Sequence, residues 1–203
     1  MDTKAHWEHI YQTKDTDQVS WYREHLDVSL ELIAKAAADR DARIVDVGSG
    51  EATLVDDLIA LGYRSVDVLD LSATALEVAK HRLGAPGDRV GWLLGDVTSY
   101  GFANQRYDLW HDRAVFHFLT EPAQRRAYVR QVVRAVRPGG HVIVATFGPE
   151  GPIQCSGLEV ARYDADALHS EFGSEFELVE HQLEVHTTPA GARQQFDYCM
   201  CRI

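Results

Sequence analysis

The feature of this sequence that most constrains its fold is a glycine turn directly behind a short β-branched segment. Residues 44–47, Ile-Val-Asp-Val, predict a buried strand, and Gly48-Ser49-Gly50 follows it at once. A helix is predicted next, from Thr53 to Leu61. Glycines let the backbone turn tightly and approach a ligand closely at the start of the following helix. This arrangement is typical of α/β proteins that bind a ligand beyond the carboxyl ends of parallel strands.

The alternation of strand and helix continues along the chain. Further strands are predicted at 65–70, 89–94, 107–111 and 141–146, and helices at 26–39, 73–83 and 122–136. Such alternation predicts an α/β fold with a mostly parallel sheet that is covered on both faces. A loop at 148–157, a helix at 164–172 and a hairpin of strands 176–186 and 194–202 follow. The last strands are therefore expected to run antiparallel to the rest.

The length of 203 residues is usual for one domain. We expect a single domain over 1–203, with an N-terminal lid at 1–25, a core at 26–146, and a substrate-side loop and hairpin at 147–203. The net charge of −11 disfavours nucleic acid as a partner. No apolar run approaches the ~20 residues of a membrane span, and the N-terminus lacks the apolar core of a signal peptide.

Three cysteines, Cys155, Cys199 and Cys201, form neither an even-numbered disulfide framework nor a zinc-site spacing. We therefore expect a reduced, cytoplasmic protein without a bound metal. Cys199 and Cys201 alternate along one predicted strand, so both point to the same face, where core packing is favoured.

Acidic residues follow the predicted strands at the same edge of the sheet. Asp70 ends the second strand 20 residues after Gly50, where a carboxylate can accept hydrogen bonds from both hydroxyls of a ribose. Asp96 follows the third strand, and Asp46 precedes the glycine turn. A dinucleotide fingerprint would place a glycine at Thr53, and Asp46 suits a cationic amino group, so S-adenosylmethionine is favoured over NAD. The alternatives are a turn anchor for Asp46, a helix cap for Asp70 and a plain loop acid for Asp96.

Five ordered motifs carry a resemblance to a known family. They are VDVGSGEA (45–52), LDLS (69–72), GDV (95–97), YDLWHDRAVFHFL (107–119) and RPGGHVIV (137–144). Together they resemble the class I S-adenosylmethionine-dependent methyltransferases, with Ala52 standing where many members carry a third glycine. The resemblance implies a Rossmann-like, doubly wound seven-stranded sheet, mostly parallel with an antiparallel C-terminal strand. It also implies S-adenosylmethionine as cofactor and S-adenosylhomocysteine as product.

The resemblance assigns a cofactor role to several residues. Asp46, Gly48 and Gly50 would line the methionine part, Asp70 would hold the ribose hydroxyls, and Leu71 would pack on the adenine. Asp96 would bind the adenine amino group, and Val97 would offer its backbone N–H to the ring. The remaining residues expected to contact the cofactor are Trp21, Ser49 and His111.

The end of the fourth predicted strand holds the candidate catalytic residues His111, Asp112 and Arg113. Methyl transfer requires an aligned nucleophile and the exclusion of water. A base is needed only if the acceptor must lose a proton, and histidine is a credible base near neutral pH. Arg113 has the alternative of pairing with Asp112 and forming part of the wall.

Two segments give opposite indications about the acceptor. The region from Trp110 to Val129 is similar to that of thiopurine and other thiol methyltransferases, whereas the opening segment is similar to a branch that includes protein-lysine methyltransferases. The candidate residues of the acceptor pocket are Trp7, Tyr11, Tyr22, His117 and Cys155. Core packing is the alternative for the aromatic residues and His117, and a plain loop position is the alternative for Cys155.

We therefore predict a methyltransferase that acts on a small molecule, with a thiol as one such acceptor, and that is a monomer or homodimer without membrane contact. A protein-lysine methyltransferase is the first alternative. A non-catalytic nucleoside-binding protein on the same fold is the second, and the three acids Asp46, Asp70 and Asp96 argue against it.

Overall fold

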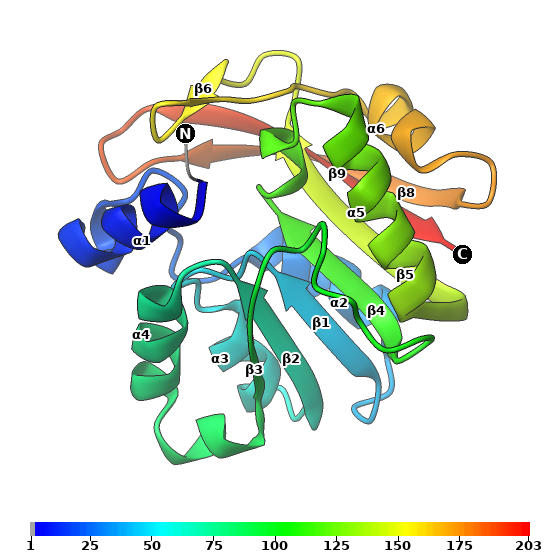
Figure 1. Cartoon of the computed structure of the whole chain (residues 1–203), viewed down its shortest axis with the longest axis horizontal. Helices are drawn as coiled ribbons and strands as arrows, with labels where there is room; N and C mark the ends of the chain where they lie inside the picture. The colour runs from blue at the N-terminus through cyan, green and yellow to red at the C-terminus, as the bar shows by residue number, and fades with distance from the viewer. Residues whose placement is uncertain (1–2) are drawn as a thin grey trace.

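The computed structural model describes residues 3–203 and contains a seven-stranded sheet in the order β3-β2-β1-β4-β5-β9-β8 (Figure 1). Its strands are β1 (Arg43–Val47), β2 (Ser65–Asp70), β3 (Gly91–Leu94), β4 (Tyr107–Arg113), β5 (Val136–Phe147), β8 (Glu177–Thr187) and β9 (Arg193–Arg202). The first five strands in the sheet order are parallel, and β9 runs antiparallel to both of its neighbours. The predicted fold class is confirmed. Both C-terminal strands were expected to run antiparallel to the rest, but this is wrong for β8. Because β8 pairs antiparallel with β9, it runs in the direction of the parallel strands, and β9 alone of the two is reversed.

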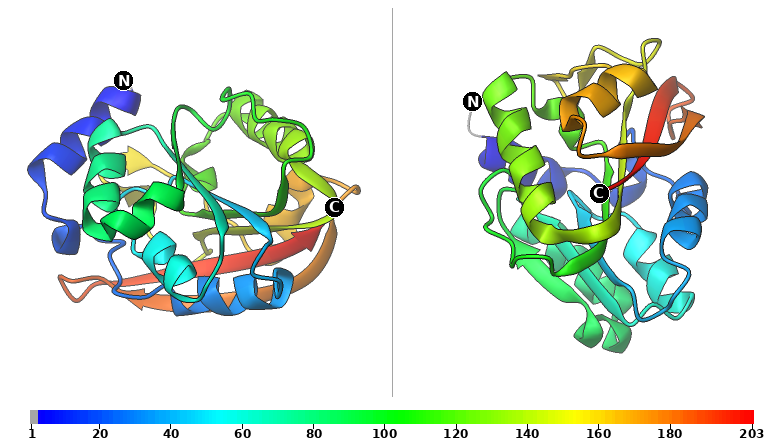
Figure 2. Two further views of the ribbon diagram at one scale, coloured as in Figure 1. Left: turned by 90° about the horizontal axis from the view of Figure 1, so that it is seen from below. Right: turned by 90° about the vertical axis from the view of Figure 1, so that its right-hand side faces the viewer.

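Helices cover both faces of the sheet. α2 (Asp27–Ala36), α3 (Leu54–Ala60) and α4 (Ala73–Leu83) bury apolar residues in one core cluster, and α5 (Pro122–Ala135) and α6 (Ala165–Phe172) bury theirs in a second. Figure 2 shows α2 and α3 on the face opposite α5. β1 and β2 are buried along almost their whole length, as expected for parallel strands between two helical layers. Three short 3-10 helices lie at Thr16–Gln18, Ala85–Arg89 and Phe116–Phe118.

Most strands differ from the prediction by one or two residues at an end, and β5 differs the most. β4 continues to Arg113, two residues beyond the predicted end at 111. β5 begins at Val136 rather than at 141, because Val136 already pairs with Tyr107. The intervening Pro-Gly-Gly segment at 138–140 bulges out of the ladder, and the pairing resumes at Leu109 and His141. The predicted strand therefore begins only after this irregularity and leaves out the first pair of the ladder.

The 148–157 loop contains structure that the sequence did not predict. β6 (Gln154–Cys155) pairs with β7 (Leu158–Glu159) in a separate two-stranded sheet. Strands of two residues are too short to give a periodic signal. The loop returns to the core through a hydrogen bond from the Tyr163 backbone N–H to the Phe147 carbonyl, 3.0 Å long.

The lid, of which residues 3–25 are described, begins with α1 (Thr3–Thr13) beside α4 (Figure 1). Glu8 of α1 accepts hydrogen bonds from the hydroxyls of Ser72 and Thr74 at the start of α4. At the other end, Arg23 forms an ion pair with Glu184 of β8. The lid is therefore fastened at both halves of the sheet.

No helix within residues 3–203 is long and apolar enough to cross a membrane. The same range contains no group of three or more histidine, cysteine, aspartate or glutamate side chains arranged to hold a metal ion.

Candidate active site

The glycine turn follows β1 directly and lies against the end of β2. The Gly48 N–H donates to the Leu69 carbonyl at 2.7 Å, and the Gly50 N–H donates to Oδ2 of Asp70 at 2.8 Å. Gly48 and Gly50 have φ angles of 65° and 52°, a conformation that residues with a Cβ rarely adopt. A Cβ on Gly48 would lie 1.9 Å from Cγ2 of Val115. Both glycines are therefore required by the geometry of the turn.

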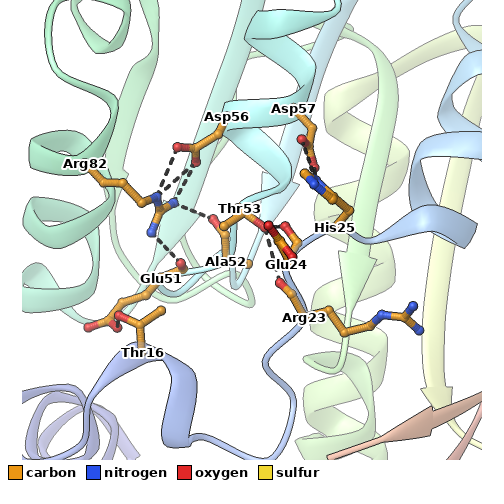
Figure 3. A network of polar contacts seen from close by, with 10 residues as sticks. All are labelled: Thr16, Arg23, Glu24, His25, Glu51, Ala52, Thr53, Asp56, Asp57 and Arg82. Atoms are coloured by element: carbon orange, nitrogen blue, oxygen red, sulfur yellow. Dashed lines mark hydrogen bonds and ion pairs between the residues drawn. The ribbon is translucent and has the colours of Figure 1, made fainter. Parts of the chain in front are cut away.

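A polar network holds the far side of this turn (Figure 3). Arg82 of α4 donates to the carbonyls of Glu51 and Ala52, at 2.7 Å and 2.8 Å, and also forms an ion pair with Asp56. Thr53 donates from its hydroxyl to the Glu24 carbonyl at 2.6 Å. The turn is thus fixed to α4 on one side and to the lid on the other. Arg82 has no recognisable signal in the sequence, because its contact with the turn depends on how α4 packs.

The three acids predicted to bind the cofactor converge on one cavity. Asp46, Asp70 and Asp96 all line it, as do Leu71 and Val97. Asp70 is 7% exposed and also accepts a hydrogen bond from the Ser72 N–H at 2.8 Å. Burial raises the pKa of Asp70 to about 6. Ser72, and not Asp70, is the capping residue of α4, because its hydroxyl accepts from the Ala75 N–H.

Most of the predicted site residues line this cavity. In addition to the acids, they are Trp7, Tyr11, Trp21, Tyr22, Gly48, Ser49, His111, Arg113 and Cys155. Gly50 supports the cavity through its bond to Asp70, whereas Asp112 and His117 lie outside the lining. Several lining residues were not predicted from the sequence, among them Glu51, Phe118, Phe147 and Phe196.

His111 is held between two neighbours and is 1% exposed. Its Nδ1 lies 2.7 Å from Oδ1 of Asp46, and its Nε2 lies 2.9 Å from the hydroxyl of Ser29 in α2. Both ring nitrogens are therefore engaged, which leaves neither of them directed at an acceptor. The arrangement instead orients the Asp46 carboxylate at the edge of the cavity.

Asp112 occupies a different position from the one predicted. Its side chain is fully buried and accepts hydrogen bonds from the Val115 N–H (2.8 Å), the Phe116 N–H (3.1 Å) and the Tyr128 hydroxyl (2.7 Å). Successive side chains of a strand point to opposite faces, so Asp112 points toward α5 while His111 and Arg113 point away from it. Asp112 therefore anchors the segment after β4, and the expected catalytic contact is not formed. Burial raises its pKa to about 7.

His117 is also a part of the core rather than of the acceptor pocket. It is fully buried and accepts a hydrogen bond from the Phe147 N–H at 3.2 Å through Nδ1. Burial lowers its pKa to about 3, so the ring is neutral at ordinary pH. The structure thus supports the alternative of core packing for this residue.

Arg113 reaches from β4 to the closing hairpin. Its Nε donates to the Tyr198 hydroxyl at 2.9 Å, and its Nη1 donates to the Trp21 carbonyl at 3.3 Å. Its Nη2 lies 3.6 Å from Oε2 of Glu184, so Arg113 pairs with Glu184 and not with Asp112. The sequence could not reveal these partners, because β8 and β9 are distant along the chain.

Aromatic side chains close the cavity beneath the lid. The ring centroid of Trp7 lies 5.7 Å from that of Trp21 and 5.1 Å from that of Phe118. Tyr11 extends toward the glycine turn, where its hydroxyl would lie 2.3 Å from a Cβ on Gly50. Tyr11 therefore lies on the side of the predicted cofactor residues, although the sequence placed it in the acceptor pocket.

The residues fit a nucleoside cofactor with an amino-acid tail. The buried hydroxyl of Ser49 lines the cavity and has no hydrogen-bond partner among residues 3–203, which leaves it available to a polar ligand. Asp70, at the end of β2, also lines the cavity, and a carboxylate at this position can accept hydrogen bonds from ribose hydroxyls.

Comparisons with known proteins agree with this geometry. Residues 44–140 match the family model described as a methyltransferase domain. A ubiquinone biosynthesis O-methyltransferase from Serratia proteamaculans is 31% identical over 117 residues, which are 57% of this chain and 47% of the relative. The human EEF1A lysine methyltransferase 2 is 18% identical over 194 residues, which are 89% of this chain and 76% of the relative. The chain thus spans about half the length of the Serratia relative.

Among solved structures, the N-methyltransferase NodS from Bradyrhizobium japonicum, in complex with S-adenosylhomocysteine, has the same fold. The TM-score is 0.75 at 14% identity, with 100% of this chain and 98% of NodS covered. The fold and the site define a Rossmann-like α/β protein with a nucleoside-binding cavity at the strand ends. More specifically, residues 44–140 resemble a methyltransferase domain, and the whole chain has the fold of an N-methyltransferase that binds S-adenosylhomocysteine.

The raised pKa of Asp70 predicts a pH dependence of cofactor binding. An ionised carboxylate can accept hydrogen bonds from both hydroxyls of a ribose, whereas its protonated form has less acceptor capacity. With a pKa of about 6, Asp70 becomes ionised between pH 5 and pH 7. Affinity for S-adenosylhomocysteine should therefore rise by about tenfold over this range, measured by calorimetry.

Asp70→Asn serves as the control, because the new side chain cannot ionise. The affinity of this variant should not follow the titration of the wild-type carboxyl, and at pH 7 it should be lower by on the order of 1–3 kcal/mol, as expected for lost charge-assisted hydrogen bonds. If Asp70→Asn bound the cofactor product as tightly as the wild type at pH 7, the ribose assignment would be contradicted.

Proposed function

We propose that this protein transfers a methyl group from S-adenosylmethionine to a small-molecule acceptor, and that a thiol is the first class of acceptor to test. The observation that carries the proposal is a lid fastened over the cavity at both sides. Besides the contacts of Glu8 and Arg23, Thr16 donates to the Glu51 carboxylate, and Nε2 of His186 lies 2.8 Å from the Ser20 carbonyl. Because the lid covers the cavity, a small molecule that fits beneath it is favoured as the acceptor.

The chemistry of the cavity suits an acceptor that needs little help from a base. When bound, S-adenosylmethionine supplies an electrophilic methyl group on a sulfonium. Asp46, oriented by His111, provides a carboxylate near the glycine turn, and Trp7, Trp21 and Phe118 exclude water. Because both nitrogens of His111 are engaged, we assign it no proton transfer. A thiol has an ordinary pKa of about 8.5, so a part of it is ionised at neutral pH without a protein base.

A protein lysine is the second candidate acceptor. It is favoured by the human lysine methyltransferase, whose similarity extends over 89% of this chain. The net charge of −11 would also attract a basic protein surface. The three cysteines are free and buried, which supports the cytoplasm as the proposed location.

Transfer of a labelled methyl group separates the two candidates. The protein is incubated with methyl-labelled S-adenosylmethionine and either a panel of thiols, phenols and amines or the protein fraction of a cell extract. We expect label in small organic products, and much less product from an Asp70→Ala variant assayed in parallel at limiting cofactor. Label that enters protein bands, with none in small products, would overturn the small-molecule proposal in favour of lysine.

A further inference from the structure

We propose that the methyl acceptor is a small aromatic anion and that Arg113 binds its negatively charged group. This inference deepens the proposed function and rests on it, because it concerns the acceptor end of the same cavity. Three features carry it: the unused hydrogen-bonding capacity of Arg113, the position of its guanidinium, and the surrounding charges and rings.

The Arg113 guanidinium is buried but incompletely partnered. Its side chain is 5% exposed, and it lines the cavity. Nη2 makes no hydrogen bond to any residue within 3–203, since its distance of 3.6 Å to Glu184 suits an ion pair but exceeds a hydrogen bond. A buried donor of a charged group without an acceptor is costly. A ligand with an anionic group would satisfy it.

The position of the guanidinium separates it from the cofactor residues. Gly48, Asp70 and Asp96 follow β1, β2 and β3, which form one half of the sheet. Arg113 extends from β4 in the other direction, across β5, and its guanidinium carbon lies 4.3 Å from the centre of the Phe196 ring on β9. The anion that Arg113 can receive is therefore placed on the acceptor side of the cavity.

The charges around Arg113 leave room for a further anion. Glu184 is shared, because it pairs with both Arg113 and Arg23 and accepts a hydrogen bond from the Tyr198 hydroxyl at 2.9 Å. Arg23 has a second partner in Asp27, which is largely exposed to solvent. His186, on the same strand as Glu184, has a pKa lowered by burial, which favours its neutral form over the cation. One carboxylate, Glu184, thus pairs with both of the guanidinium groups, Arg23 and Arg113, that line the cavity.

The walls beside Arg113 are apolar and aromatic. Phe147 and Phe196 lie opposite one another on β5 and β9, with ring centroids 4.9 Å apart, and both line the cavity together with Trp21 and Cys155. Burial raises the pKa of the Cys155 thiol to about 11, so it contributes no anion of its own. Aromatic walls favour a planar ring, and their low polarity strengthens the attraction between a guanidinium and an anion.

Binding of two matched probes to the protein saturated with S-adenosylhomocysteine tests the inference. Benzoate carries the aromatic ring and the anion, whereas benzyl alcohol has nearly the same shape without the charge. We expect NMR titrations to show at least tenfold tighter binding of benzoate to the wild type. Arg113→Met should remove this preference and leave the affinity for S-adenosylhomocysteine within twofold. Arg64→Met, which removes an exposed cation paired with Asp41, should retain it.

A second variant keeps the test independent of the folding of the first. Glu184→Gln removes the competing carboxylate and preserves an acceptor for the Tyr198 hydroxyl, so benzoate should bind several-fold more tightly. The inference is overturned if benzoate fails to bind at millimolar concentration or shows no preference over benzyl alcohol. It is also overturned if Arg113→Met weakens cofactor binding tenfold, since Arg113 would then serve the cofactor. Label found only in protein bands in the transfer assay would instead refute the small-molecule proposal itself.

Discussion

A Gly48→Ala variant is expected to lose cofactor binding. The new Cβ would lie 1.9 Å from Cγ2 of Val115, and a φ of 65° is unfavourable for alanine. Because Val115 has a short, stiff side chain, relief of the clash requires a shift of the turn or of the segment that carries Val115. We expect affinity for S-adenosylhomocysteine to fall by more than about 100-fold, or about 3 kcal/mol, measured by calorimetry.

Gly62→Ala is the matched control for this variant. Gly62 has a φ of 90°, yet a Cβ there would meet nothing within 4 Å, and the residue does not line the cavity. It should lower the free energy of unfolding by about 1 kcal/mol and leave cofactor affinity unchanged. If Gly48→Ala bound the cofactor within tenfold of the wild type, the close approach of the turn would not be essential for binding.

The Asp112→Ala variant should have its main effect on stability. It would leave the N–H groups of Val115 and Phe116 and the Tyr128 hydroxyl buried without their acceptor. Each unsatisfied buried donor costs about 1–3 kcal/mol, so we expect the free energy of unfolding to fall by about 3 kcal/mol or more. Urea denaturation at constant pH measures this loss.

Asp88→Ala removes an exposed carboxylate and should change stability by less than about 0.5 kcal/mol, which makes it the control. If Asp112 had the catalytic role predicted from the sequence, the Asp112→Ala variant would show the opposite result. The variant would then have the stability of the wild type and strongly reduced methyl transfer. That result would show that Asp112 acts in catalysis and would contradict the structural role.

The cofactor half of the site was predictable because strand ends are easily located. β2 and α4 have the bounds predicted from the sequence, and parallel neighbours bring Asp46, Asp70 and Asp96 to one edge of the sheet. Spacing along the chain therefore sufficed to bring these residues together. The glycine turn lies where the first strand was expected to end.

The acceptor half depends on contacts that spacing does not specify. His111, Asp112 and Arg113 are adjacent in sequence, yet their alternation within β4 sends Asp112 to the opposite face. The partners of the other two come from distant elements, namely Ser29 in α2 and Glu184 in β8. Side-chain packing between elements, rather than any local pattern, decides which of the three faces the cavity.

The place of β9 in the sheet has a consequence for the order in which the protein can assemble during synthesis. β8 emerges before β9 but pairs with the sheet only through it, so β8 has no neighbour when it is first made. During that interval its backbone has no strand partner. Its side chains Val179, Leu183 and Val185 are exposed even in the folded protein, so the unpaired strand is a risk for aggregation. β9 also brings Phe196 and Tyr198 to Arg113. During synthesis, the cofactor half of the site can thus form before the strand that completes the acceptor half has been made.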